Sequence, residues 1–132
     1  MSNLPEKFTD LFVAEKKALA YLALVKHDGT PQVTPVWFDF DGTHIIINTA
    51  RGRVKDKILH KHPRVALAIA DPANPYRYVQ VSGKVVGETE DGGYEQICAL
   101  AEKYRGVREY PKNPGEVRVT YKILPEKFTT MG

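Results

Sequence analysis

The chain has 132 residues, of which 42% are hydrophobic and 27% charged, and these fractions are ordinary for one globular domain. No window approaches the roughly 20 apolar residues of a membrane span, the polar start MSNLPEKFTD lacks the pattern of a secretory signal, and the single cysteine, Cys98, excludes an internal disulfide. These features argue against a membrane protein and a disulfide-stabilised secreted one. They predict a cytoplasmic protein with one domain over residues 1–132.

Apolar residues at helical spacing open the chain. Leu4, Phe8, Leu11 and Phe12 recur at the intervals of an amphipathic helix, and Pro5 is favourable near a helix start. Two strand-like runs follow, LAYLALV and QVTPVWFDF, and the Asp-Gly pair in KHDGTPQ between them predicts a hairpin turn. A second Asp-Gly turn, in DFDGTHIIINT, leads into a third strand.

The second half of the chain continues this alternation. A short helix is predicted from about residue 54 to 61, ending before Pro63. The run RVALAIAD predicts a strand buried on both faces, the loop DPANPYRY follows, and YRYVQVSGKVVGETE alternates as a strand with Gly83 at a bulge. DGGYEQICALAEKYRG predicts a second helix that buries Cys98 and ends at Gly106, and VRVTYKILPEKFTTM supplies the last strand or two.

The pattern of elements predicts the fold class. About six strands, joined mostly by tight turns and accompanied by about three helices, favour a mainly β (α+β) fold. Consecutive hairpins of this kind are typical of a small antiparallel barrel and not of a doubly wound sheet.

Positive charge is concentrated in NTARGRVKDKIL, where the third strand gives way to the short helix. Between residues 51 and 64 six bases stand against one acid, whereas the other residues carry 13 bases and 15 acids. The first turn of a helix offers unpaired N–H donors, so it can bind phosphate. Lysine there opposes the helix dipole, and a bound anion would offset that conflict. The alternatives are a solvated helix face and a nucleic-acid contact, although one basic spot is not the stripe that nucleic acid needs.

Other chemistry has little support in the sequence. His60 and His62 are two positions apart and would face different directions on a helix, and no cysteine or carboxylate cluster accompanies them, so no metal site is predicted. No nucleophile–base motif or nucleotide-type Gly-rich loop is present. The reactive chemistry of an enzyme would therefore belong to a cofactor. Four aromatic residues fit either a wall against a flat ring or a core or dimer interface: Trp37, Phe38, Tyr76 and Tyr78.

Three ordered segments resemble a known family: ALAYLALVKHDGTPQVTPVWFDFDG, IIINTARGRVKDKILHKHPRVALAIADP and YRYVQVSGKVVGETE. Together they are similar to the pyridoxamine 5'-phosphate oxidase-like flavoproteins, and most similar to the branch of F420-dependent reductases. The resemblance runs from about Ala18 to Leu124. It implies a six-stranded split β-barrel of the FMN-binding type and a homodimer that binds its cofactor between subunits. The cofactor would be the deazaflavin coenzyme F420 or, alternatively, FMN.

The resemblance also implies a set of cofactor-binding residues. They are Thr34, Pro35, Val36 and Trp37 beside the ring, Asn48 and Thr49 at a strand end, Arg53, Lys55 and Lys57 at the phosphate, and Tyr78 from the next subunit or strand. The glutamyl tail of F420 would suit further cations such as Arg51 and Lys61. The implied activity is hydride transfer between F420 or FMN and a small unsaturated or quinone-like substrate.

Two other functions stay open, and the chain differs from one well-known member of the family. A binding or carrier protein for FMN or haem without turnover is the second hypothesis, and a nucleic-acid-binding barrel is the third. The chain departs from pyridoxamine-phosphate oxidase itself in two places. Its strand reads VTPVWFDF where those oxidases carry an Arg-x-x-x-Leu pattern, and the sequence ends with KILPEKFTTMG, where those oxidases carry a C-terminal segment that closes over pyridoxal phosphate. Oxidation of vitamin B6 is therefore not expected.

Overall fold

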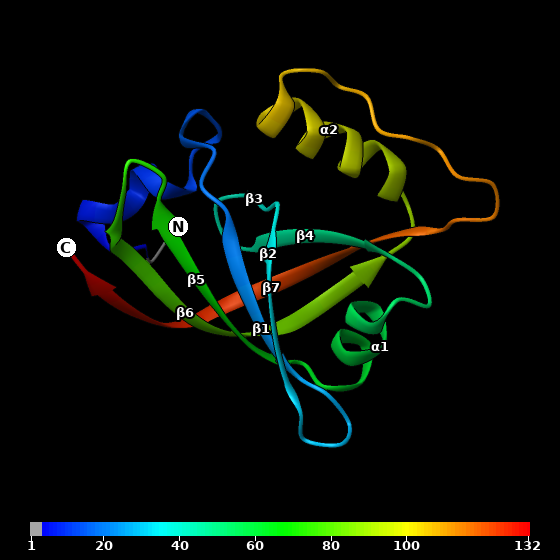
Figure 1. Cartoon of the computed structure of the whole chain (residues 1–132), viewed down its shortest axis with the longest axis horizontal. Helices are drawn as coiled ribbons and strands as arrows, with labels where there is room; N and C mark the ends of the chain where they lie inside the picture. Colours follow the sequence, from blue (N-terminus) through cyan, green and yellow to red (C-terminus); the bar gives the residue numbers. More distant parts are fainter. Residues whose placement is uncertain (1–3) are drawn as a thin grey trace.

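The computed structural model describes residues 4–132 and shows a strongly curved antiparallel sheet flanked by helices (Figure 1). Seven strands lie in the order β2-β1-β5-β6-β7-β4-β3. The strands are β1 (Ala20–Val25), β2 (Pro31–Val36), β3 (Asp39–Phe40), β4 (Ile45–Ala50), β5 (Arg64–Asp71), β6 (Asn74–Thr89) and β7 (Arg118–Met131). The helices are the 3₁₀ segments η1 (Glu6–Phe12) and η2 (Ala14–Lys16) and the α-helices α1 (Val54–Lys61) and α2 (Gly93–Arg105).

The strand count corrects the sequence prediction, because the sheet has seven strands and not six. QVTPVWFDF reads as one strand, but the chain leaves β2 after Val36 and pairs again only at β3. Between them Phe38 turns fully into the core, where its ring meets that of Phe12 edge-on at 6.1 Å. Burying this large ring ends the edge strand β2, and the chain resumes as the two-residue strand β3 beside β4, at the opposite edge of the sheet.

The N-terminal helix differs from its prediction in type but not in its buried face. Phe8, Leu11 and Phe12 are buried as the spacing predicts, but the backbone forms 3₁₀ turns. The boundaries of α1 coincide with the prediction, and α2 ends at Gly106, whose φ of 80° is left-handed. Such a residue at the end of a helix is most often glycine, because glycine has no Cβ to clash.

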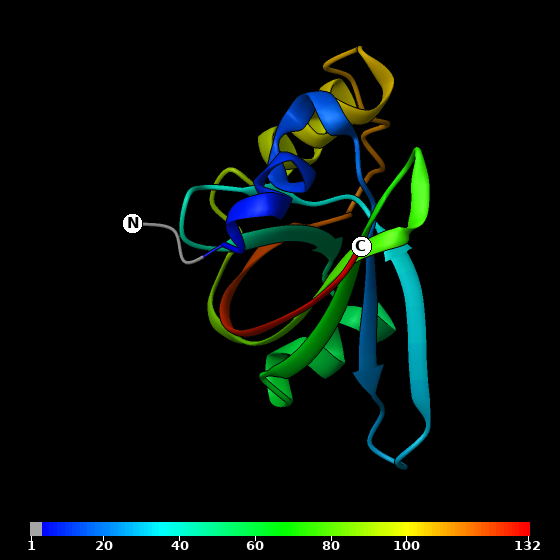
Figure 2. The ribbon, with the colours of Figure 1, turned by 90° about the vertical axis from the view of Figure 1, so that its left-hand side faces the viewer.

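Two long strands give the sheet its curvature. β6 and β7 pair along most of their length, and their register shifts between Ser82 and Gly83 and again between Val85 and Gly87. The predicted bulge at Gly83 is confirmed, and a Cβ there would lie 2.7 Å from the carbonyl oxygen of Leu124. Bulges bend and twist a strand. The sheet therefore curls into a half-barrel that encloses the core, as Figure 2 shows.

The half-barrel stays open between its two edges. β2 forms one edge, β4 with β3 forms the other, and the two edges do not pair. α1 follows β4, and α2 lies across the far end of β4 and β7 (Figure 1). In the part of the chain that the structure describes, no helix combines the length and apolar character needed to cross a membrane. The split between the edges is where the candidate site lies.

Candidate functional site

The junction between β4 and α1 is built around Asp56. Its carboxylate accepts hydrogen bonds from the Tyr121 hydroxyl at 2.6 Å, from the Gly52 backbone N–H at 2.9 Å and from Arg51 at 3.0 Å. Gly52 has a φ of 90°, so the chain can reverse from strand to helix there. Burial would raise the pKa of Asp56, but the hydrogen bonds outweigh it and lower that pKa. This buried acid fixes the direction in which α1 leaves the sheet.

Lys55 points from the first turn of α1 toward the opposite edge of the split. Its ammonium donates a hydrogen bond to the hydroxyl of Thr34 on β2, with 3.0 Å between nitrogen and oxygen. The side chain is half-buried, and burial lowers the pKa of Lys55, with a further lowering from the positive charge of Arg53. Among residues 4–132, no carboxylate lies within ion-pair distance of this ammonium. Lys55 and Thr34, both predicted site residues, therefore meet at a cation that lacks a counter-ion.

The two arginines of the basic junction, the segment from Asn48 to Leu59 that joins β4 to α1, are paired with carboxylates. Arg51 contacts three carboxylates, those of Asp56 at 3.0 Å, Glu88 at 2.6 Å and Glu90 at 2.8 Å. Arg53, the residue just before α1, is 3.1 Å from Glu116. The local excess of positive charge in the sequence is thus largely compensated by acids from β6 and from the loop before β7. Arg51 is committed to the fold, and Arg53 keeps other N–H donors free.

Asn48 on β4 is held in a network that joins three elements. Its amide nitrogen donates to the Gly93 carbonyl oxygen of α2 at 2.8 Å, and its amide oxygen accepts from the guanidinium of Arg118 on β7 at 2.9 Å. Arg118 is 7% exposed and also approaches Glu116 at 3.4 Å. Sequence reasoning found Asn48 but missed Arg118 and Glu116. Their only signal in the sequence is a pair of oppositely charged residues, two positions apart, just where the last strand begins.

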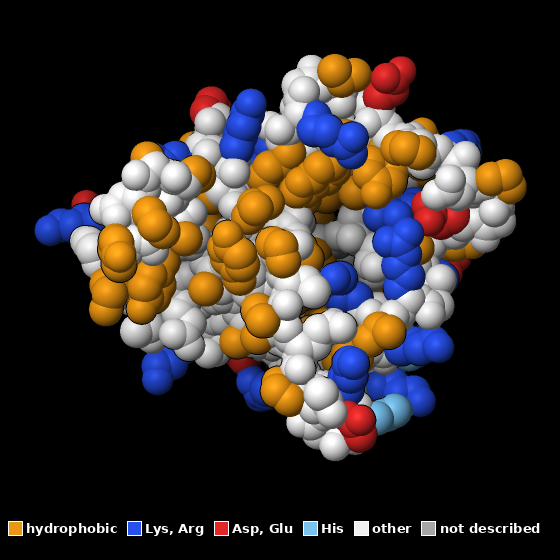
Figure 3. Space-filling model, in the orientation of Figure 1, with side chains coloured by type: hydrophobic (Ala, Val, Ile, Leu, Met, Phe, Trp, Pro, Cys, Tyr) orange, Lys and Arg blue, Asp and Glu red, His pale blue; other side chains and the backbone are white. Residues whose placement is uncertain are grey.

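Trp37 leaves β2 and enters an aromatic cluster against α2. Its ring stacks on Tyr104 with 5.4 Å between centroids and 8° between planes, and Tyr110 meets it edge-on at 6.2 Å. The Arg105 guanidinium lies 4.8 Å from the Trp37 ring centroid. Figure 3 shows a band of hydrophobic side chains in the region of α2 and, below it, a hollow flanked by Lys and Arg side chains. The site therefore combines an apolar aromatic wall with a cationic margin.

The other residues predicted near the ring divide between the two faces of the sheet. Val36 packs against the core. Pro35 is exposed on the outer face, where it pairs with Tyr21 of β1. Thr49 is 2% exposed and pairs with the core residue Val119, so its side chain faces inward. Contacts of these three residues with a cofactor stay predictions.

Two predicted residues lie away from Lys55. Lys57 follows two positions later on α1, about 200° around the helix, and lines a cavity of about 520 Å³ on the other side of α1. Tyr78 on β6 is half-buried and three strands from β2, which is about 14 Å along the sheet at the usual strand spacing. Within one chain the structure does not bring either residue to the Lys55–Thr34 contact.

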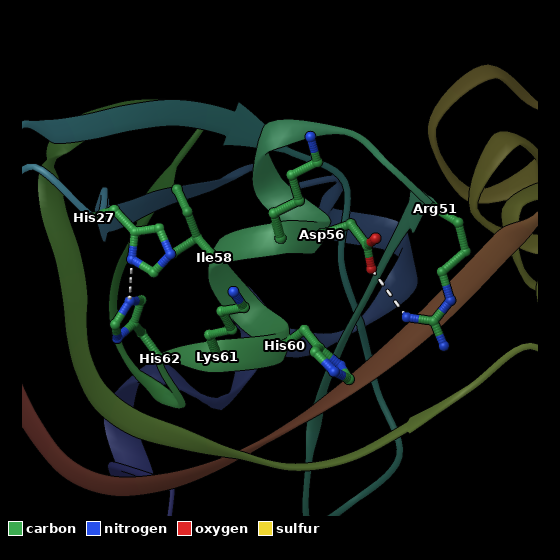
Figure 4. Close-up of a pocket in the computed structure, with 8 residues that line it drawn as sticks. His27, Arg51, Asp56, Ile58, His60, Lys61 and His62 are labelled. Carbon is green, nitrogen blue, oxygen red and sulfur yellow. Dashed lines mark hydrogen bonds and ion pairs between the residues drawn. The ribbon is translucent and has the colours of Figure 1, made fainter.

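The cavity beside α1 is lined by basic side chains and histidines (Figure 4). His62 approaches His27 with 3.2 Å between ring nitrogens, and His60 pairs with Glu88 at 2.7 Å. Lys61 also lines this cavity. Among the residues that the structure describes, no three His, Cys, Asp or Glu side chains gather to hold a metal ion.

Residues 5–130 match the family described as pyridoxamine 5'-phosphate oxidase. The chain belongs to this family. Among solved structures it is similar to an F420 reductase, at 32% identity and a TM-score of 0.83 over 96% of this chain and 98% of that one. It is also similar to a conserved hypothetical protein from Mycobacterium tuberculosis (22%, TM-score 0.73, 97% and 84% covered) and to General Stress Protein 26 from Bacillus anthracis (19%, 0.68, 96% and 92%). The last two likenesses concern the fold alone.

Membership in the pyridoxamine 5'-phosphate oxidase family confirms the resemblance first seen in the sequence segments. The geometry of the chain shows which groups a ligand could contact. One half-buried ammonium is available to an anion, an arginine beside it has unused donors, and an aromatic cluster closes the upper side. Such a set suits a ligand with a phosphate at one end and a flat ring at the other.

Proposed function

We propose that the chain binds coenzyme F420, or alternatively FMN, in the split of the half-barrel and acts as an oxidoreductase. The observation that carries the proposal is Lys55, a half-buried cation with a hydroxyl partner and, among the described residues, no carboxylate partner. Burying a charge without a counter-ion is unfavourable. A bound phosphate would supply the missing negative charge, and Thr34 would hold the ammonium in place for it.

The residues around Lys55 fit the other parts of such a cofactor. Arg53 can donate to the same phosphate through the N–H groups that Glu116 leaves free. The Trp37 cluster, in which Tyr104 stacks on the Trp37 ring and Arg105 lies over it, offers an aromatic wall beside which a tricyclic ring could lie. Similarity at 32% identity to a protein named F420 reductase favours F420 over FMN. The choice between them belongs to this proposal.

The bound cofactor would supply the atom that donates or accepts the hydride. The chain's own part would be to bind the phosphate, orient the ring and keep water from it. The acceptor would be a small unsaturated or quinone-like molecule. No side-chain acid or base is assigned to the reaction. We place the reaction in the cytoplasm, where the free, buried thiol of Cys98 would stay reduced.

The cofactor would lie between two copies of the chain. Inside one chain, Tyr78 lies three strands away from Thr34, the hydrogen-bond partner of Lys55. In a homodimer the tyrosine of one copy could face the Lys55 site of the other. The dimer and the role of Tyr78 are part of the proposal, and the exposed outer face of the sheet supports them.

A binding titration tests the proposal. The purified protein is titrated with F420, FMN and riboflavin while ring fluorescence is followed, and the same is done for Lys55→Met and Lys57→Met. We expect F420 or FMN to bind more tightly than riboflavin, which has no phosphate. Lys55→Met should weaken binding at least tenfold, about the 1.4 kcal/mol of a lost charged contact. Lys57→Met, which removes the same charge from the other side of α1, should change the binding of FMN, which has no acidic tail, less than twofold.

Turnover separates an oxidoreductase from a carrier. The reduced form of whichever cofactor binds is mixed with the protein and a quinone such as menadione, and reoxidation is followed at the absorption band of the ring. Faster reoxidation with the wild type than with Lys55→Met supports the enzyme. Tight binding without acceleration would point to a cofactor carrier. Absence of binding by all three ligands would overturn the proposal altogether.

A further inference from the structure

Glu116 places a negative charge beside the proposed phosphate site. One carboxylate oxygen lies 3.1 Å from the Arg53 guanidinium, and the other lies 3.4 Å from that of Arg118. The Glu116 side chain is 15% exposed. The carboxylate is thus shared by two arginines and largely removed from water, so its charge is screened less than that of a surface acid.

The surroundings of Glu116 hold it in place. Its backbone N–H donates to the Asn113 carbonyl oxygen at 3.1 Å, which closes a turn just before β7. Arg118 is fixed in turn by its 2.9 Å hydrogen bond to Asn48, and its guanidinium lies 5.2 Å from the Tyr110 ring centroid. A ligand at Arg53 would therefore meet a carboxylate that cannot easily move away.

Charge at the site is distributed unevenly as a result. Lys55 has no carboxylate partner, whereas Arg53 and Arg118 share one. A phosphate held by Lys55 and by the free N–H groups of Arg53 would lie roughly 7 Å from the Glu116 carboxylate, the span of one guanidinium and two hydrogen bonds. Each negative charge on that phosphate is attracted by Lys55 and repelled by Glu116.

We propose that Glu116 is a specificity-determining residue that disfavours a phosphate monoester, with its two negative charges, relative to a phosphodiester, with one. This inference rests on the proposed function, because it concerns the cofactor phosphate bound at Lys55 and Arg53. At neutral pH a monoester carries about −1.5 to −2, and a diester carries one charge. FMN ends in a monoester. The phosphate of F420 is a diester that links the ring portion to its tail, so Glu116 acts in favour of F420.

The size of the effect follows from Coulomb's law. Arg53, which would lie between the phosphate and Glu116, is 55% exposed to solvent, so water contributes to the screening between them. With an effective dielectric constant of about 50 and a separation of roughly 7 Å, one pair of unit charges changes an affinity by about fivefold. Removing the Glu116 charge should therefore raise the affinity for a singly charged phosphate about fivefold. The same change should raise the affinity for a doubly charged phosphate about 25-fold. An uncharged ligand should not respond.

The experiment compares FMN, its phosphate monomethyl ester and riboflavin, which share one ring and differ in charge. Dissociation constants are measured for the wild type, Glu116→Gln and Glu126→Gln. The amide oxygen of Glu116→Gln can still accept a hydrogen bond from one of the two arginines, whereas its amide nitrogen cannot accept from the other. Glu126→Gln neutralises a carboxylate that pairs with Arg64 instead. We expect Glu116→Gln to gain about five times more affinity for FMN than for the ester, with riboflavin unchanged. Glu126→Gln should change none of the three by more than twofold.

The possible outcomes test the role of Glu116 separately from the proposed cofactor binding. Equal gains for FMN and its ester, or no gain, would overturn the role of Glu116 while leaving cofactor binding intact. If FMN and its ester bind no better than riboflavin in either protein, and F420 does not bind in the titration above, both the inference and the proposed function are overturned. If circular dichroism shows that Glu116→Gln does not fold, Glu116→Ser removes the same charge and leaves room for water beside the arginines. The same fivefold difference is expected of it.

Discussion

Two neighbouring residues in the first turn of α1 have opposite electrostatic surroundings. Asp56 is 6% exposed, and three donors outweigh its burial so that its pKa falls. Lys55 is half-buried with one hydroxyl acceptor, and burial lowers its pKa. The acid is satisfied by the fold, whereas the base is not. Of the two charged groups, only the Lys55 ammonium lacks an oppositely charged partner that a bound ligand could supply.

A substitution of Lys55 should therefore separate stability from binding. Since burial lowers the pKa of Lys55, the charged form is disfavoured in the folded chain at neutral pH. Lys55→Met keeps the apolar stem and removes the charge, so we expect the free energy of unfolding to rise by about 0.5–2 kcal/mol. Urea denaturation of the cofactor-free protein at pH 7 measures it.

The matched variant is Lys57→Met on the exposed side of the same helix, for which we expect a change within about 0.5 kcal/mol. A Lys55→Met protein that is less stable than the wild type would contradict the view that this charge is poorly accommodated by the fold alone. It would instead make the Thr34 hydrogen bond a structural contact.

The contact between α2 and β7 depends on one glycine. A Cβ on Gly93 would overlap the carbonyl oxygen of Arg118, although alanine is the better helix former. Gly93→Ala should push α2 from β7, break the Asn48–Gly93 hydrogen bond and lower the free energy of unfolding by about 1–3 kcal/mol. Urea denaturation is the measurement, with a cofactor titration beside it.

Gly87→Ala, in β6, is the control for the Gly93→Ala variant. The nearest atom to a Cβ at Gly87 is that of Lys122 at 4.0 Å, an ordinary contact. We expect a change of no more than about 0.5 kcal/mol there. If both variants lost stability equally, the loss would come from glycine replacement in general, and the close approach of α2 to β7 would not be its cause.

The turn between β3 and β4 should lose its stabilisation in acid. Burial would raise the pKa of Asp41, but hydrogen bonds from the backbone N–H groups of His44 and Thr43 outweigh it and lower the pKa from 3.8 to about 2. A carboxyl with a lowered folded pKa stabilises the fold above its unfolded pKa. That stabilisation disappears as pH falls through the folded value. For Asp41 the window runs from about pH 4 down to about 2.

Comparison of the wild type with Asp41→Ala tests this window. At pH 7 we expect the variant to be less stable by about 1 kcal/mol, the cost of the lost charged hydrogen bonds at a partly exposed site. The difference should shrink between pH 4 and pH 2 in urea denaturation series. Asp28→Ala, in the more exposed turn between β1 and β2, should show a smaller effect throughout. A difference that does not depend on pH would contradict the assignment.

Local structure was the part that the sequence predicted best. The bounds of α1 and the bulge at Gly83 follow from proline, glycine and apolar spacing, which act over a few residues. The seventh strand was missed because Phe38 is buried by contacts distant in the chain. At the site, the Lys55–Thr34 pair was expected as neighbours of one ligand. The pairing of Arg53 with Glu116 was not, since it depends on how β7 lies against β4.

In the whole molecule, the basic junction contacts segments that are distant in the sequence. Acids from β6 and from the loop before β7 pair with its arginines, whereas no carboxylate among residues 4–132 pairs with the lysines on the two sides of α1. The positive charge left over is divided between the split and the cavity beside α1. Of the two cations predicted to suit the tail of F420, Lys61 lines that cavity together with Lys57, whereas Arg51 is paired with carboxylates.

The outer face of the sheet supports a homodimer. β1 and β2 expose apolar side chains there, with Tyr21 at 42%, Val25 at 57% and Val33 at 65% exposure. The apolar run of β5 predicts burial on both faces, but its outer residues, such as Ala66 beside Ala23, are only half-buried in a single chain. A second copy packed on this face would complete their burial and cover the exposed patch.

We therefore expect twice the 14.8 kDa chain mass in light scattering or sedimentation. Val33→Glu would bury a charge at the interface, at a cost of about 2 kcal/mol or more, and so raise the dimer dissociation constant at least about 30-fold. Val107→Glu adds the same charge to an equally exposed valine in the loop after α2 and should leave the dimer intact. If Tyr78 contributes to the Lys55 site of another copy, as proposed, Val33→Glu should also weaken cofactor binding. A monomeric wild type, or full binding by monomeric Val33→Glu, would place the whole site within one chain and remove Tyr78 from it.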